Sequence, residues 1–229
     1  MSNVKSFSAT ADKGTILHFL GGLGLVRNND FDLLWENFCL RVDAWAKLKG
    51  WRSQPRGVVE FANNANGELS EAWEEYRIGE IAPYFKSSSA TIRMDALAMV
   101  DESPDVWKPE GYWVEIADLV VRCADTMTEF DVPSQLDVLR LGYGFDELVF
   151  PLTYANIITQ LRTKLSELDV ITDEAVTLKE RPGLNMVPVQ TCAMAFVAAG
   201  ACGVDLVELL DLKMRYNDTR AARHGGKIA

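Results

Sequence analysis

Histidine is rare in this sequence, and its few cysteines show no pairing pattern. The 229 residues include two histidines and four cysteines, and no two cysteines stand in a CxxC spacing. Because neither histidine lies near a cysteine, a zinc site is not expected, and no disulfide framework is indicated. We expect buried free thiols in a reducing compartment, at Cys39, Cys123, Cys192 and Cys202.

Positive charge is also in short supply. Lysine and arginine total 23 against 33 acidic residues, which gives a net charge of −10 and an isoelectric point near 4.8. A sequence-independent nucleic-acid binder needs a basic face, so nucleic acid is not an expected partner. A small ligand that carries phosphates remains compatible with an acidic protein, because a metal ion can mediate between the two.

A convincing membrane segment is missing from the sequence pattern. The apolar run Ile16–Val26 is too short and too rich in glycine to span a bilayer. It follows Lys5 and Lys13, but no small-residue cleavage site of a signal peptide comes after it. Its GGLG stretch lacks the lysine of a phosphate-binding loop. We therefore expect a cytoplasmic protein without a membrane partner.

Helical periodicity dominates the sequence. Hydrophobic residues make up 48% and charged residues 24%, an ordinary globular composition in a chain long enough to bury a substantial core. Asp30 is the expected N-cap of the first helix, and Gly50 and Gly79 are expected stops. The apolar spacing predicts helices over about 30–49, 58–78, 111–130, 145–168, 186–201 and 205–217.

Two segments are less regular. Residues 80–109 form a mixed linker, in which a short helix near Ile92–Val100 is one option. Asp169–Arg181 fits a short β-hairpin as well as a helix. Because few other stretches alternate, the predicted fold class is all-α, a helical bundle.

The stretch GELSEAWEEYR (Gly67–Arg77) carries four glutamates. At about 100° per residue, Glu68 and Glu71 border the apolar stripe of this helix, whereas Glu74 points to solvent. Taken alone, this ExxE pattern is more typical of a solvated helix face, because glutamate is a good helix former.

A second pair of acids has the same placement. In EIADLVVRCADTM, Glu115 and Asp118 border the apolar stripe as Glu68 and Glu71 do. If the two helices pack as neighbours, four carboxylates converge at the rim of the core, where repulsion and desolvation require a compensating cation. Carboxylate oxygens suit Mg²⁺ or Mn²⁺, which also accept substrate phosphates.

With both acid pairs in this order, the chain resembles the MazG-like all-α nucleoside-triphosphate pyrophosphatase superfamily, which includes the dimeric dUTPases. The family pattern is an ExxE helix, a spacer and an ExxD helix, matched here by ELSE and EIAD. WAKLKGW (Trp45–Trp51) resembles the end of the family's first helix. The tail KMRYNDTRAARHGGK (Lys213–Lys227) is similar to a K-x-x-x-N-x-x-R and HGGK ending of phage and bacterial members.

The resemblance implies a role for each matched residue. The implied Mg²⁺ ligands, with Mn²⁺ as a substitute, are Glu68, Glu71, Glu115 and Asp118. The implied substrate-binding residues, which contact phosphates or sugar, are Lys213, Asn217, Arg220 and Lys227. Metal-activated water would attack the α-phosphorus of a (d)NTP and release a monophosphate and pyrophosphate, with Glu68 or Glu71 accepting the proton. A homodimer and a role in deoxynucleotide pool control, in a phage as one setting, are also implied.

The sequence also allows other functions than a general triphosphate pyrophosphohydrolase. The protein could be a dUTPase of the dimeric type that also accepts dUDP, although the first helix has no clear uracil-recognition pattern. A helical nucleotide-binding regulatory protein would keep the fold without turnover. The basic tail could also merely complement a helix dipole.

Residues 133–203 depart from the compact family pattern, in which the basic tail follows soon after the ExxD helix. They are either a helical insertion or a degenerate second copy of the acid-bearing pair. In the second case the acids Glu68, Glu71, Glu115 and Asp118 correspond to Leu161, Lys164, Val189 and Cys192. We expect one domain over 1–229, with metal-binding helices at 30–130, the insertion or repeat at 133–203 and the substrate-binding tail at 204–229.

Three further expectations concern residues beside the acids. Asp125 either extends the metal site or forms a salt bridge, with the salt bridge favoured. Glu75 and Arg122 are expected to pair or to orient the ligands. Trp73 is expected in the core.

Overall fold

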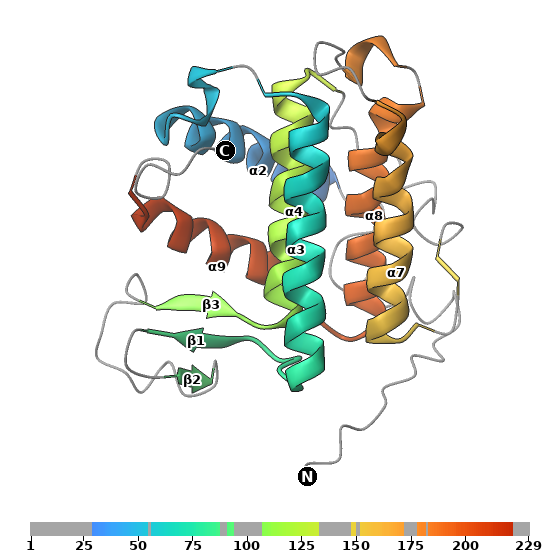
Figure 1. Cartoon of the computed structure of the whole chain (residues 1–229). Coiled ribbons are helices and arrows are strands. Elements are labelled where there is room, and N and C mark those ends of the chain that lie inside the picture. The colour runs from blue at the N-terminus through green and yellow to red at the C-terminus, as the bar shows by residue number, and fades with distance from the viewer. Residues whose placement is uncertain are drawn as a thin grey trace.

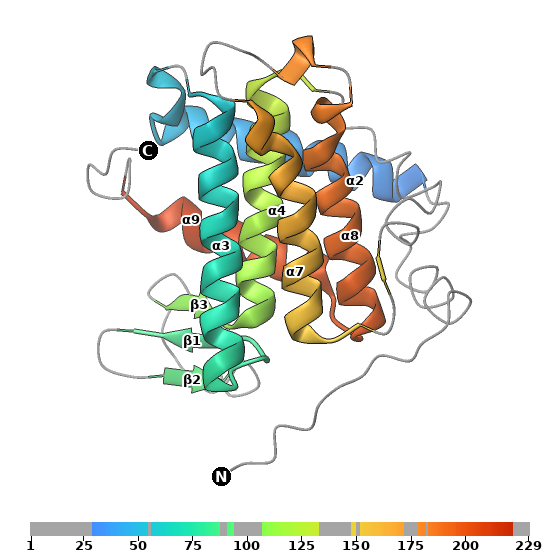
Figure 2. The same ribbon diagram turned by 45° about the vertical axis from the view of Figure 1, so that its right-hand side comes forward.

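The computed structural model describes residues 29–54, 56–87, 91–93, 107–132, 148–149, 152–171, 178–181 and 183–221, with the side chains of 29–33 excepted. Within them, four helices pack around one another in a closed bundle (Figures 1 and 2). They are α3 (Val58–Ile78), α4 (Tyr112–Glu129), α7 (Tyr154–Leu165) and α8 (Val187–Ala201). Two more helices, α2 (Asn29–Leu48) and α9 (Leu206–Thr219), pack against α4. The mainly helical class is confirmed.

Helix α3 has the predicted bounds. Gly57 precedes it, and Gly79 ends it in the left-handed conformation with φ 84°, donating from its backbone N–H to Tyr76. The first helix begins one residue early, so Asp30 lies in the first turn of α2 and the predicted N-cap is wrong. Helix α8 is buried on all sides, which agrees with its almost continuous apolar sequence.

The predicted helix 145–168 is too long at its N-terminal end. Leu148 and Val149 are not helical, and α7 begins only at Tyr154. The cause is a capping box, in which the Thr153 hydroxyl accepts from the Asn156 backbone N–H and the Asn156 side chain accepts from the Thr153 N–H. These bonds fix the entry of the chain into the helix.

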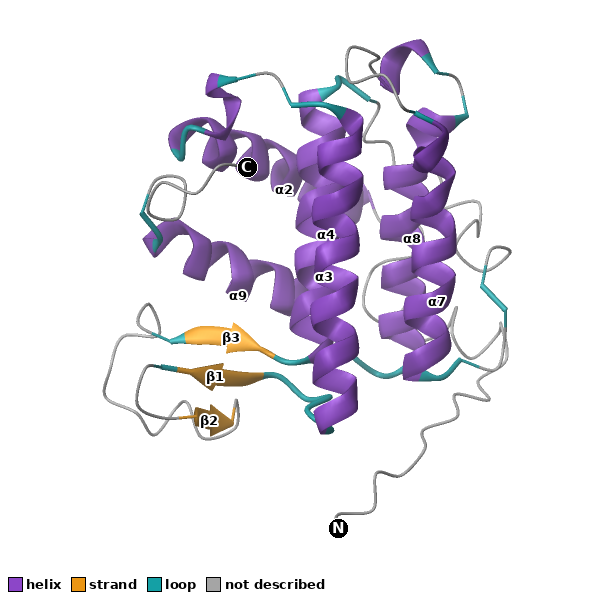
Figure 3. Cartoon of the chain, viewed as in Figure 1, coloured by secondary structure: helices purple, strands orange, loops and turns teal. Residues whose placement is uncertain are grey.

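A small antiparallel sheet lies beside α9 and the end of α3 (Figure 3). It consists of β1 (Tyr84–Lys86), β2 (Thr91–Arg93) and β3 (Lys108–Glu110), in the order β2-β1-β3. The expected short helix from Ile92 is wrong at its first two residues, which belong to β2, and residues 94–100 lie outside the described part. Strands of three residues are too short to give an alternating pattern.

Gly111 joins the sheet to α4 at a very close backbone approach. Its φ is 118°, and a Cβ here would lie 2.8 Å from the Ala82 carbonyl oxygen. Next to it, the Tyr112 N–H donates to the Glu80 carbonyl at 3.0 Å. Glycine is required here, because an L side chain would meet both strain and collision. The contact fixes the position of the N-terminus of α4 and therefore of the acids in its first two turns.

The segment 152–171 and 183–201 completes the bundle, since α7 packs on α3 and α8 packs on α4. The residues set against the acids in the hypothetical repeat are buried there, and Lys164 pairs with Glu167 at 2.8 Å. The repeat itself stays a prediction. The described ends of the alternative hairpin, Ser166–Val170 and Leu178–Glu180, are 3₁₀ turns.

One described segment, Leu184–Ala201, is long and apolar enough to cross a membrane, but 78% of it is buried within the protein, as in the core helix of a globular domain. The core also contains Trp35, Trp45 and Trp113. Trp73 does not belong to it. Its side chain is 38% exposed and lies against Tyr76, so its predicted core position is wrong.

Candidate metal centre

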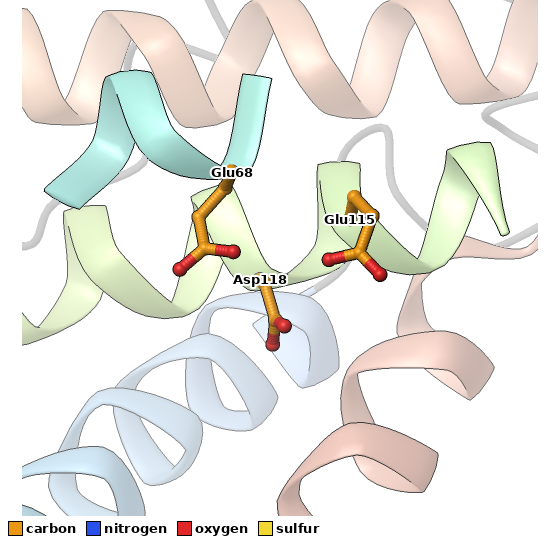
Figure 4. Close-up of side chains that lie close together, drawn as sticks. All are labelled: Glu68, Glu115 and Asp118. Carbon is orange, nitrogen blue, oxygen red and sulfur yellow. The ribbon is translucent and has the colours of Figure 1, made fainter. Parts of the chain in front are cut away.

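Three of the four predicted acids come together between α3 and α4. Glu68 lies midway along α3, Glu115 in the first turn of α4 and Asp118 one turn later. One carboxylate oxygen of each lies within 4.8 Å of the others, and the side chains gather beside one another (Figure 4). The packing of α3 on α4 places them there, as the shared position beside each apolar stripe predicted.

Glu115 is the most unusual member of this acid cluster, which comprises Glu68, Glu115 and Asp118. It is 1% exposed, and neither of its oxygens accepts a hydrogen bond from the described residues. Burial raises the pKa of Glu115 to about 9, with Asp118 and Glu71 adding to the effect and Lys213 opposing it. A buried carboxyl without hydrogen bonds is costly as an anion, so this site favours either a proton or a cation.

Two basic side chains neutralise the other members of the cluster. Arg122 Nε donates to Glu68 Oε1 at 2.8 Å, and Lys213 Nζ lies 2.5 Å from Asp118 Oδ2. Burial and the Asp118 charge raise the pKa of Glu68 even so, although Arg122 opposes them. Burial would lower the pKa of Lys213, but the charges of Asp118 and Glu115 outweigh it and raise that pKa.

Glu71 lies at the rim, not in the cluster. Its side chain is exposed, yet its charge contributes to the raised pKa values of Glu68 and Glu115, where burial is the largest cause. Of the four predicted ligands, therefore, three form a close group, and the fourth faces solvent beside them.

Helix α9 supplies two of the four predicted substrate-binding residues. Lys213 and Asn217 are buried on one face of it, and the Asn217 Oδ1 has no partner among the described residues. Arg220 does not share that helical face, because α9 ends at Thr219 and Arg220 has an extended backbone. Lys227 lies outside the described residues.

Side chains at the C-terminal end of α2 donate hydrogen bonds to backbone carbonyls at the C-terminal end of α9. Trp45 Nε1 donates to the Asn217 carbonyl at 3.1 Å, and Lys49 Nζ donates to the Asp218 carbonyl at 2.8 Å and to that of Arg220. These bonds satisfy carbonyls that a helix C-terminus leaves free. Trp45 and Lys49 of the WAKLKGW segment therefore have a structural role, which is to bind the C-terminal end of α9.

The remaining polar neighbours differ in part from expectation. Asp125 forms salt bridges with Arg52 at 2.7 Å and Arg56 at 3.0 Å, which confirms the favoured alternative. Arg122 pairs with Glu68, a predicted ligand, and not with Glu75, so the alternative of a Glu75–Arg122 pair is wrong and the contact agrees with the other alternative, that Arg122 orients a ligand. Glu75 instead accepts a hydrogen bond from the Tyr84 hydroxyl at 3.2 Å.

Sequence reasoning missed Lys108, which β3 brings to this region. Strand β3 packs against α4 and α9, and the charges of Glu115 and Lys213 both act on Lys108. Its only sequence signal is its position shortly before the ExxD helix, within the stretch 80–109 that was expected to be a mixed linker.

The donor set fits a divalent cation of the Mg²⁺ or Mn²⁺ type. Three carboxylates offer hard oxygen ligands, and the two Glu115 oxygens have no hydrogen-bond donor in the described part of the chain. Comparison of the chain with protein-family models, with curated proteins and with solved structures finds no match. This geometry and the two acid motifs are therefore the features of the chain that bear on its function.

Proposed function

We propose that the protein is a Mg²⁺-dependent nucleoside-triphosphate pyrophosphohydrolase that converts a (d)NTP to a (d)NMP and pyrophosphate. The observation that carries the proposal is the acid cluster, in which one carboxylate oxygen each of Glu68, Glu115 and Asp118 lie within 4.8 Å of one another and the buried Glu115 accepts no hydrogen bond from any described residue. Structural ion pairs rarely leave such a carboxyl unpaired, whereas a metal ligand must keep at least one carboxylate oxygen available. The finer MazG-like bundle type and a homodimer belong to the same proposal.

Each residue has a task that follows from its surroundings. Glu68, Glu115 and Asp118 would hold the cation, with Glu71 joining them from the rim. A bound divalent cation lowers the pKa of a water ligand and neutralises polyphosphate charge. Glu71 is the accessible carboxylate beside the cluster, so it can accept the proton of the attacking water, a task for which Glu68 is less suited because Arg122 occupies it.

The α9 residues would serve the substrate. Lys213 carries a positive charge beside Asp118, and the buried Asn217 amide oxygen has no hydrogen-bond donor in the part of the chain that the structure describes. Arg220 begins the segment after α9 and is partly exposed, so its guanidinium is available for a phosphate.

A second candidate is a helical nucleotide-binding protein without turnover. The favouring observation is that Arg122 and Lys213 already neutralise two of the three acids. Ion-pair networks of this kind also shift pKa values in proteins that are not enzymes. The two candidates differ in whether a bound nucleotide is hydrolysed.

The test is product analysis with purified protein, Mg²⁺ and each canonical ribo- and deoxyribonucleoside triphosphate. We expect at least one to yield the monophosphate and pyrophosphate. Glu115→Gln and Asp118→Asn should abolish turnover, whereas Glu74→Gln, on the solvent face of α3, should leave it unchanged. Metal and nucleotide binding without hydrolysis would favour the second candidate. Turnover of dUDP would identify a dUTPase of the dimeric type.

A further inference from the structure

Lys213 is poorly placed to be the first cation that an incoming phosphate meets. It is 2% exposed, and its ammonium is engaged with Asp118. A strongly paired and buried ammonium has few free donors for a ligand that arrives from solvent. An accessible cation beside the acid cluster must come from another element.

Lys108 on β3 has the required position. Its side chain is 36% exposed, and its ammonium lies 2.8 Å from Glu110 Oε1. Strand β3 packs against both α4 and α9, the helices that carry Glu115 and Lys213. In both views of the chain β3 lies directly beside α9 (Figures 1 and 2). Besides burial and the Glu110 carboxylate, the charges of Lys213 and Glu115 act on the pKa of Lys108, which agrees with a position of Lys108 beside the cluster.

The register of the sheet shows which side chains lie on the same face as Lys108. Lys108 lies opposite Lys86, and Glu110 lies opposite Tyr84, so these four side chains share one face. The Tyr84 hydroxyl on that face donates to Glu75 of α3. That face of the sheet therefore reaches α3 near its C-terminal end, through Tyr84, whereas Phe85 and Pro109 are buried on the other face.

From these placements we infer that Lys108 is a substrate-binding residue that contacts the phosphate chain of the nucleotide, at the part released as pyrophosphate. The inference rests on the proposed function. The phosphate would replace Glu110 as the partner of the ammonium, since a lysine on a flexible stem can exchange one oxyanion for another. The small sheet then has a task in the site, because it brings a cation to an otherwise acidic region.

The probe is inorganic pyrophosphate with Mg²⁺, measured by calorimetric titration on the full chain. Lys108→Gln should weaken pyrophosphate binding about 10- to 100-fold, the loss expected for one charge-assisted hydrogen bond. Lys108→Arg should restore part of it. Glu110→Gln should tighten pyrophosphate binding, because it removes the competing carboxylate. A purely structural Lys108–Glu110 pair would instead make both neutral variants lose affinity.

Lys86→Gln is the matched control. Lys86 is the exposed cross-strand neighbour of Lys108, so this substitution removes the same charge from the same face of the sheet. It should change pyrophosphate affinity much less than Lys108→Gln does. Equal losses in the two variants would indicate a general electrostatic field and overturn the contact. Unchanged affinity in a folded Lys108→Gln variant would also overturn it. If the unmodified protein hydrolyses no triphosphate and binds no Mn²⁺, the proposed function has failed, which is a different result.

Discussion

Replacement of Glu115 by glutamine should remove a large pH dependence from the stability of the metal-free protein. Glu115 is almost wholly buried, and burial raises its pKa from 4.5 to about 9. Glutamine has nearly the same volume and no titrating proton. The variant therefore isolates the ionisation of this one group.

The sign follows from proton binding in the two states. Between pH 4.5 and about 9 the folded protein keeps a proton on Glu115 that the unfolded chain has released. Stability is therefore fully present below pH 4.5 and is lost as the pH rises through about 9, by about 1.4 kcal/mol for each pH unit. From pH 5 to pH 8 the Glu115 contribution amounts to a loss of about 4 kcal/mol.

The assay is urea denaturation followed by tryptophan fluorescence, in the presence of a chelator, at several pH values from 5 to 8. We expect the free energy of unfolding of the unmodified protein to fall with pH much more steeply than that of Glu115→Gln. Glu74→Gln, an exposed acid on α3, should behave like the unmodified protein. Parallel pH profiles for the unmodified protein and Glu115→Gln would refute the reasoning.

Three further substitutions test other parts of the structure by the same denaturation assay. Arg122→Met should lower the free energy of unfolding by about 3 kcal/mol at pH 8, because it leaves the buried Glu68 carboxylate unpaired. Mn²⁺ should reduce this loss of stability, and an equal loss with and without Mn²⁺ would contradict the prediction. Thr153→Ala should cost about 1 kcal/mol by removing the cap of α7, and Thr153→Ser should cost little. Gly111→Ala should cost about 2 kcal/mol or more through its positive φ and the Ala82 contact, so a neutral effect would show that the turn can adjust.

The helices and the acid cluster could be predicted because both depend on local spacing. An apolar stripe predicts which face of α3 and α4 is buried, and three of the four acids beside the stripes come together when the stripes pack, whereas Glu71 stays at the exposed rim. Gly79 marked the end of α3 for the same local reason. Trp73 misled the prediction because it lies at the far edge of the stripe, where Tyr76 can cover it without burying it.

The partners of the acids could not be predicted, because they come from distant parts of the chain. Lys213 reaches Asp118 from α9, and Lys108 arrives on a strand of three residues. Neither position has a periodic pattern that points to the cluster. Arg122 was expected beside the ligands. Whether it pairs with Glu68 or Glu75 depends on the rotation of α3 against α4, which the spacing of residues along each helix does not determine.

The central claim is that the acid cluster binds a divalent cation, and Mn²⁺ titration followed by electron paramagnetic resonance tests it most directly. We predict that the full chain removes free Mn²⁺ from solution with a saturable affinity and that Mg²⁺ competes. Glu115→Gln should abolish this binding, whereas Glu74→Gln should leave it intact. Binding that is absent, or that survives unchanged in a folded Glu115→Gln variant, would contradict the claim.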